Sequence, residues 1–152
     1  MIPLRGAAEI ASRLELAAAD TILLVEPPAE VEDLVTGALS DGQALRTVEG
    51  RAVRSVKDQF ALVLVWQESR VGSQSVLEAA SKRVAPEGFL WVATALRKVS
   101  GPKTAAIHRL ELHDLEKAFS KSGLVRDREV RLSAWHVAYR FAPKRSTPSY
   151  ST

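Results

Sequence analysis

The sequence predicts an α/β fold, a three-layer α/β/α sandwich whose mostly parallel sheet has six or seven strands. Continuous apolar runs at 21–25, 60–66 and 89–94 are typical of strands that are buried on both faces. Segments with helical apolar spacing alternate with these runs, which favours helices on both sides of a parallel sheet. The last segment instead alternates apolar and polar residues, and this pattern predicts a C-terminal antiparallel hairpin.

Length and composition indicate one globular domain. The chain has 152 residues, of which 46% are hydrophobic and 26% are charged. We place the domain at 1–142 and expect 143–152, rich in Lys, Arg, Ser, Thr and Pro, to be a disordered basic tail. No apolar run approaches the roughly 18 residues of a membrane span, and no signal-peptide core follows Met1, so we expect a cytoplasmic protein. Without cysteine, the chain can form neither disulfides nor thiolate sites.

Helices and strands are predicted to alternate in the first two thirds of the chain. In order, we expect a helix over 7–18, a strand over 21–25, a helix from Pro28 or Ala29 to Leu39, strands over 44–48 and 60–66, a helix over 75–84 that Pro86, Glu87 and Gly88 end, and a strand over 89–94. Gly42 is free to adopt a left-handed turn after the second helix. Ser75 and Glu78 predict a capping box. Residues 51–56 are either a helical turn or irregular.

The C-terminal part is predicted to contain a helix over 112–119, with Gly123 as its cap, and then strands over 124–132 and 134–142. Ser133 and Ala134 occupy the place of a tight turn or bulge. We expect the packed face of the last strand to carry Trp135, Val137, Tyr139 and Phe141. His136 then belongs to the wetter face.

Positive charge is concentrated in the last third. Residues 1–96 hold 9 Lys/Arg and 13 Asp/Glu, whereas residues 97–152 hold 12 and 5. Arg97, Lys98 and Lys103 form a predicted basic loop after the strand at 89–94. Such a loop binds a phosphate or a nucleic-acid backbone, or it only solubilises the protein.

Four stretches carry a resemblance to a known family. They are 11–16, 23–30, 86–93 and 113–124. The strand–helix alternation, the stretch 113–124 and the terminal hairpin resemble the Rossmann-like sheet of class I S-adenosylmethionine-dependent methyltransferases. The stretches 11–16, 23–30 and 86–93 carry a narrower resemblance. More narrowly, the chain resembles a bacterial family of small methyltransferase-like domains of unknown function. The resemblance spans about residues 7–142.

The first strand–helix turn departs from the methyltransferase pattern. Methyltransferases of this class have an acidic residue and Gly-x-Gly here, whereas this chain has Glu26, Pro27, Pro28, Ala29 and Glu30. Proline offers no N–H to a ligand, and no glycine lets the backbone approach one. Glu26 matches the acidic position only loosely. We therefore expect no S-adenosylmethionine in the usual pose, and hence no cofactor.

Three further positions are candidates for ligand binding at the strand ends. The resemblance implies that Glu49, after the second strand, accepts hydrogen bonds from ribose hydroxyls. Gln67 and Glu68 follow the strand at 60–66 and are placed to line a crevice at the carboxyl ends of the strands. Each of these residues is also explained as an ordinary solvated side chain.

Other chemistries are disfavoured. His108, His113 and His136 lack the spacing of a metal site. We find no P-loop, no nucleophile elbow and no Ser–His–acid order around a strained turn. The three tryptophans are expected in the core.

Three functions remain open. The first is a degenerate, non-catalytic methyltransferase-like domain that acts as a binding or interaction module, with a protein partner or a second copy of itself. The second is a divergent S-adenosylmethionine-dependent methyltransferase, and the third is a nucleic-acid-binding accessory protein that uses the basic C-terminal third.

Overall fold

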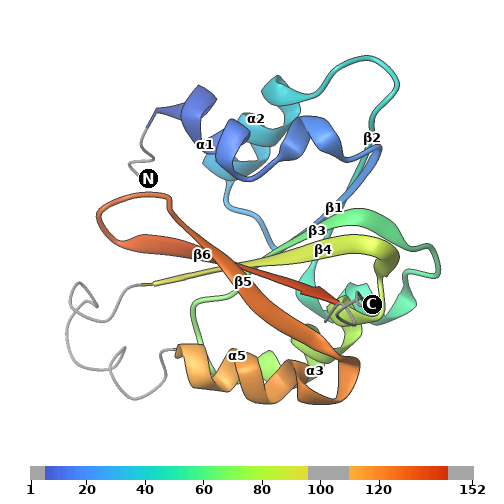
Figure 1. Cartoon of the computed structure of the whole chain (residues 1–152), viewed down its shortest axis with the longest axis vertical. Coiled ribbons are helices and arrows are strands. Elements are labelled where there is room, and N and C mark those ends of the chain that lie inside the picture. The colour runs from blue at the N-terminus through green and yellow to red at the C-terminus, as the bar shows by residue number, and fades with distance from the viewer. Residues whose placement is uncertain (1–5, 96–109, 144–152) are drawn as a thin grey trace, which may run out of the picture.

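The computed structural model describes residues 6–95 and 110–143 (Figure 1). The predicted basic loop, with Arg97, Lys98 and Lys103, and His108 lie outside the described residues, as does the tail from residue 144. No helix in the described part is both long and apolar enough to span a bilayer.

The described elements alternate as the sequence predicts. In chain order they are α1 (Ala7–Arg13), the 3-10 helix η1 (Leu16–Ala18), β1 (Thr21–Val25), α2 (Ala29–Ala38), β2 (Ala44–Val48), the 3-10 helix η2 (Gly50–Ser55), β3 (Phe60–Trp66), α3 (Ser73–Ser81), β4 (Val84–Ala95), α5 (Leu112–Phe119), the 3-10 helix η4 (Ser120–Ser122), β5 (Leu124–Arg131) and β6 (His136–Pro143). The uncertain stretch 51–56 is thus a 3-10 helix. Gly42 and Gly123 have the expected left-handed conformation.

The sheet has six strands in the order β2-β1-β3-β4-β6-β5. The first four are mutually parallel, and β6 runs antiparallel to both β4 and β5. The predicted mostly parallel sheet with an antiparallel C-terminal hairpin is therefore confirmed. β6 is an interior strand, and β5 forms the edge.

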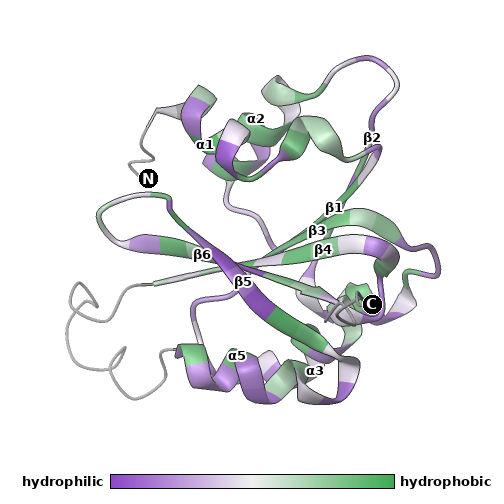
Figure 2. Ribbon diagram, viewed as in Figure 1, coloured by the Kyte–Doolittle hydropathy of each residue, from purple (hydrophilic) through white to green (hydrophobic). Residues whose placement is uncertain are grey.

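Helices cover both faces of the sheet (Figure 1). On one face, α3, α5 and η2 pack on alternate strand residues such as Leu23 and Val63. On the other face, α1, η1 and α2 pack on the intervening residues, such as Ile22 and Leu64. The central strands are accordingly apolar along their length in Figure 2, whereas α5 is hydrophilic on its outer side. The double burial predicted for these strands is confirmed.

β4 begins earlier than predicted. The strand starts at Val84, so Pro86, Glu87 and Gly88 belong to it and do not end a helix. Val84 pairs with Phe60, but Phe89 pairs with Leu62, so the extra residues bulge opposite β3. A Cβ atom at Gly88 would lie 2.6 Å from the carbonyl oxygen of Ala61. The glycine therefore permits a close backbone approach at the bulge.

The capping box predicted from Ser75 and Glu78 is wrong. The N-cap of α3 is Gly72, in a left-handed conformation, and Ser75 lies inside the helix. The Glu78 carboxylate accepts a hydrogen bond from the Gln74 amide instead. A reciprocal capping box does occur at α5, between Glu111 and Asp114.

The faces predicted for the last strand are also wrong at its start. Trp135 is 45% exposed, whereas His136, expected on the wetter face, is only 7% exposed. Trp135 precedes β6 and lies in the β5–β6 turn. His136 is buried because its ring packs on that of Trp66, with centroids 4.9 Å apart, and contacts Ser133 and Glu68. Trp66 and Trp91 are buried as expected.

Ion pairs connect the hairpin to the segment after α1. Glu15, in a left-handed conformation, accepts hydrogen bonds from Arg140 at 2.6 Å and from Arg128 at 2.5 Å. Arg140 also donates two hydrogen bonds of 2.8 Å to Asp127, and its guanidinium lies 4.9 Å from the centroid of the Phe89 ring. We call Glu15, Asp127, Arg128 and Arg140 the hairpin ion-pair network.

Candidate functional site

The predicted ligand residues meet at one edge of the sheet. The parallel strands β1, β2 and β3 end at Val25, Val48 and Trp66, so Glu26, Glu49, Gln67 and Glu68 follow them at the same edge. The chain passes from β1 to β2 on one side and later to β3 on the other. Such a change of direction forms the crevice in which open α/β sheets bind ligands. We call this region the carboxyl edge.

Glu26 binds to the protein itself. Its φ is 59°, a left-handed conformation that costs a residue with a Cβ atom roughly 1–2 kcal/mol. The backbone N–H of Glu26 donates to the carbonyl of Val48, and its Oε1 accepts the N–H of Gly50 at 2.7 Å. The side chain therefore joins the end of β1 to the start of η2. Pro28 is the N-cap of α2.

Glu49 is more accessible than Glu68, whose side chain is 46% exposed. The Glu49 side chain is 67% exposed, and its Oε1 lies 3.2 Å from Nε of the still more exposed Arg51. An exposed pair of this kind contributes at most about 1 kcal/mol. The Glu49 carboxylate can therefore exchange Arg51 for the hydroxyl groups of a ligand at low cost.

Glu68 is held in a defined orientation at the end of β3. Its Oε2 accepts Nε1–H of Trp66 at 2.8 Å and lies 3.2 Å from Nε2 of His136. These hydrogen bonds, that of His136 above all, lower the pKa of the Glu68 carboxyl. Gln67 differs, because its side-chain amide donates to the carbonyl of Ser69 at 2.8 Å. Glu68 is thus an oriented anion, whereas Gln67 stabilises its own turn.

Ser133 extends this contact into a chain of hydrogen bonds that sequence reasoning missed. Its Oγ lies 3.1 Å from Nδ1 of His136 and accepts the backbone N–H of Trp135 at 3.0 Å. With Glu68 ionised, Nε2 of His136 carries a proton, and in the neutral imidazole the Ser133 hydroxyl then donates to Nδ1. Ser133 is fully buried and therefore out of reach of a substrate. The chain of contacts orients Glu68 and is no nucleophilic triad; its only sequence signal is Ser-x-x-His across a tight turn.

The carboxyl edge also holds both ends of the segment that links β4 to α5. Oγ1 of Thr94 donates to the carbonyl of Leu110 at 3.4 Å, and the N–H of Leu110 donates to the carbonyl of Glu68 at 3.0 Å. Within 6–95 and 110–143, no His, Asp and Glu side chains gather in a group that would hold a metal ion.

Comparisons with known proteins identify the fold. The chain matches no protein-family model, and no curated protein is significantly similar to it in sequence. Among solved structures, an S-adenosylmethionine-dependent methyltransferase from Aquifex aeolicus superposes with a TM-score of 0.70 at 8% identity, over 90% of this chain and 88% of that one. The N-methyltransferase NodS from Bradyrhizobium japonicum WM9 gives 0.59 at 15% identity, over 91% and 94%.

A third similar structure is the magnesium protoporphyrin IX methyltransferase from Synechocystis PCC 6803 with bound S-adenosylhomocysteine. Its TM-score is 0.59 at 9% identity, over 91% of this chain and 80% of that one. At these identities the likeness concerns the fold alone. The chain has the Rossmann-like fold of class I methyltransferases, as the resemblance in sequence implied.

Proposed function

We propose that this chain is a divergent S-adenosylmethionine-dependent methyltransferase that binds its cofactor at the carboxyl edge. The observation that carries the proposal is the exposed Glu49 carboxylate after β2, beside a β1–α2 turn whose left-handed Glu26 retains a conformation usually made by glycine. The similar folds are methyltransferases, and one of them is described with bound S-adenosylhomocysteine. These findings support an enzyme better than the non-catalytic module expected from the sequence.

The residues fit one half of the cofactor better than the other. Glu49 is suited to accept two hydrogen bonds from the ribose, and hydrogen bonds to a charged acceptor contribute about 1.5–3 kcal/mol each. The amino-acid end lacks its usual contacts, because Pro27 and Pro28 have no N–H and the Glu26 carboxylate already binds Gly50. We therefore expect the ligand's carboxylate to lie differently in this protein. When bound, S-adenosylmethionine supplies an electrophilic methyl group on its sulfonium.

Glu68 is suited to the acceptor side of the reaction. It is an oriented anion at the end of β3, held by Trp66 and His136. Its lowered pKa keeps the carboxyl ionised, so that it can only accept a hydrogen bond from an N–H or O–H group of the methyl acceptor. Its role in this proposal is to orient that group toward the methyl donor.

The second candidate function is the non-catalytic binding or interaction module. The hydrogen bond between Glu26 and Gly50 favours the module. In a cofactor site the Glu26 carboxylate would be free to bind the ligand, whereas here it binds the backbone of the protein. The partner of such a module would be another protein or a second copy. Binding of nucleic acid through Arg97, Lys98 and Lys103 remains a third proposal, on residues outside the described part.

Calorimetry with S-adenosylhomocysteine and S-adenosylmethionine separates the first two functions. If the chain is a methyltransferase, we expect a micromolar dissociation constant. Glu49→Ala should raise it at least about tenfold, a change of about 1.4 kcal/mol in the free energy of binding. Glu87→Ala removes an exposed acid from β4 and serves as the control, with no expected effect. Binding of neither ligand below about a millimolar would reject the enzyme and favour the module.

A further inference from the structure

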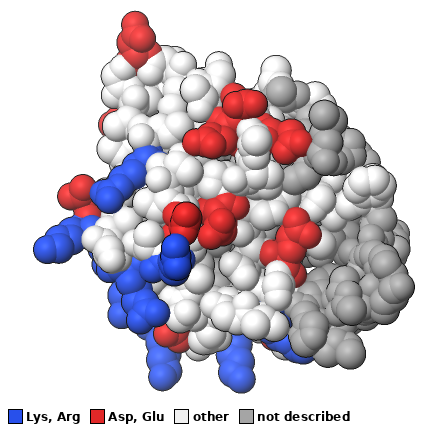
Figure 3. Space-filling model, turned by 180° about the vertical axis from the view of Figure 1, so that it is seen from behind, with Lys and Arg blue, Asp and Glu red and all other residues white. Residues whose placement is uncertain are grey.

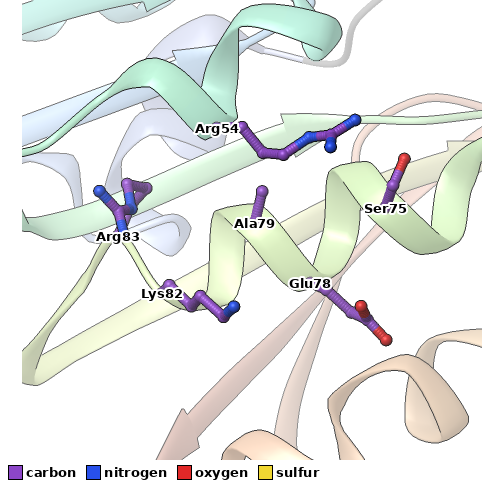
Figure 4. Close-up of a pocket in the computed structure, with 6 residues that line it drawn as sticks. All are labelled: Arg54, Ser75, Glu78, Ala79, Lys82 and Arg83. Carbon is purple, nitrogen blue, oxygen red and sulfur yellow. The ribbon is translucent and has the colours of Figure 1, made fainter.

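A hollow lies between η2 and α3. Its volume is about 380 Å³, and its lining residues are Arg54, Ser75, Glu78, Ala79, Lys82 and Arg83 (Figure 4). Arg83 lies just before β4, and its carbonyl accepts the N–H of Phe60, where β3 begins. Since parallel strands begin at the edge opposite their carboxyl ends, this end of the hollow is remote from Glu49 and Glu68. We call it the η2–α3 groove.

Two of the three cations of the groove have no partner among the described residues. Arg54 and Lys82 are exposed, and within 6–95 and 110–143 no ion pair or hydrogen bond involves their side chains. In Figure 4 they lie on opposite sides of Ala79, which leaves space between them because its side chain is small. Their charges are therefore available to a ligand.

The third cation, Arg83, is fixed in place, but one of its hydrogen-bond donors has no acceptor. Nη1 of Arg83 donates to the carbonyl of Val56, which anchors the guanidinium between η2 and β4. Nε of Arg83 is buried and has no acceptor in the described structure. A buried donor without an acceptor is costly and uncommon in folded proteins. The guanidinium thus contributes a fixed positive charge to the wall of the groove.

The one acid of the groove does not neutralise these charges. The Glu78 carboxylate extends away from Arg54 in Figure 4 and accepts a hydrogen bond of 2.7 Å from the Gln74 amide. The Ser75 hydroxyl extends toward the side of Arg54, where it adds a further donor. Lys and Arg side chains also collect at the lower left of Figure 3, the side of the molecule on which α3 lies. The local field therefore favours an anion.

We propose that the η2–α3 groove binds the phosphate group of a ligand through Arg54, Lys82 and Arg83. Phosphate has several strong acceptor oxygens, and arginine presents planar donors that match them, while lysine contributes a point charge. The Lys82 and Arg83 end of the site lies at the edge of the sheet opposite to the proposed cofactor site. The phosphate belongs either to a small phosphorylated molecule or to the backbone of a nucleic acid.

Isothermal titration with inorganic pyrophosphate, and separately with a single-stranded oligothymidylate, tests the site in the full chain at low ionic strength. The test variant is Arg54→Ala with Lys82→Ala, which removes two exposed side chains and leaves the Arg83 anchor intact. The control is Arg46→Ala with Arg131→Ala, which removes the same charge from exposed positions on β2 and β5. Amide shifts in η2 and α3 serve as a second readout.

The proposal expects at least one probe to bind below about a millimolar, with affinity lost at least about tenfold in the test variant and kept in the control. Tight binding of pyrophosphate alone identifies a small phosphorylated ligand. Much tighter binding of the oligonucleotide, with a steep loss in salt, identifies a nucleic-acid backbone. Absence of binding by both probes, or an equal loss in the control variant, overturns the proposal.

Discussion

The parallel half of the sheet and the hairpin half are stabilised by different physics. In β1, in β3 and in the second half of β4 the side chains are almost all apolar and buried between two helical layers. In the hairpin, β5 carries Arg126, Asp127, Arg128 and Glu129 in succession, and these exposed residues contact the rest of the chain largely through ion pairs. The same sheet thus passes from a hydrophobic centre to a charged edge.

This difference indicates which half of the sheet is more sensitive to mutation. Apolar burial is non-directional and strong per side chain, so the parallel half tolerates loss of volume poorly. An exposed ion pair contributes little by itself, but a charged group whose partners are removed can be costly when half-buried. We therefore expect a gradient of mutational effects from β3 to the tail.

The largest effect is expected in the middle of β3. Leu64 is 3% exposed and packs in the cluster beneath α1 and α2. Leu64→Ala should lower the free energy of unfolding by roughly 2–5 kcal/mol, because it leaves a cavity in a close-packed core. Urea denaturation measures the change, and the edge-strand variant Arg46→Ala provides the comparison. A loss below about 0.5 kcal/mol would mean that the parallel half is not the stable half.

A smaller effect is expected from the hairpin ion-pair network. The Arg140 side chain is 16% exposed and bonds to both Asp127 and Glu15. Arg140→Ala should cost about 2 kcal/mol, because hydrogen bonds between charged groups contribute about 1.5–3 kcal/mol and two acids lose their counter-charge. Arg126→Ala removes a more exposed cation with longer ion pairs and should cost under about 0.5 kcal/mol. Equal losses in the two variants would show that burial does not decide the strength of these contacts.

A pH-dependent effect is expected from the hydrogen-bonded acid at the carboxyl edge. The pKa of Glu68 is lowered from its ordinary 4.5, first by the hydrogen bond with His136. The ionised group therefore contributes stability above about pH 4.5, and this share is lost as the pH falls through the folded pKa. The Glu68→Gln variant should be less stable than the natural chain at pH 6, with a difference that shrinks toward pH 3. The urea midpoints of both proteins at the two pH values measure this difference. A difference that does not change with pH would contradict its assignment to the ionised Glu68 carboxylate.

The smallest effect is expected from the tail. Residues 144–152 have no apolar stripe, so their deletion should change the melting temperature by no more than about two degrees. Differential scanning calorimetry of the shortened chain tests this. A decrease of about ten degrees would mean that the tail packs on the domain or on a second copy.

The sequence predicted the parallel half well, for a physical reason. A strand buried on both faces must be apolar at every position, so the bounds of β1 and β3 agree with the predicted 21–25 and 60–66. β2 also agrees with the predicted 44–48, although it is a largely exposed edge strand. The hairpin faces were less predictable, because the burial of His136 depends on its contacts with Trp66 and Glu68, which are distant in sequence. Periodicity reports which residues share a face but not which neighbour covers it.

The candidate site was predicted in position but not in detail. That Glu26, Glu49, Gln67 and Glu68 share one edge follows from the topology of parallel strands. The partners of these side chains are distant in sequence: Gly50 lies 24 residues from Glu26, and His136 lies 68 residues from Glu68. Since such contacts exist only in the folded chain, no local pattern predicted them.

The hydrogen bond between Thr94 and Leu110 has a consequence for how this fold can be altered. The chain leaves β4 and returns toward α5 at the same point, so whatever lies between them spans almost no distance. For a flexible loop with adjacent ends, each doubling of its length costs only about 0.6 kcal/mol in closure entropy. Positions 94 and 110 are therefore natural ends for grafting a foreign segment of another length, because they stay adjacent while the sheet is unchanged.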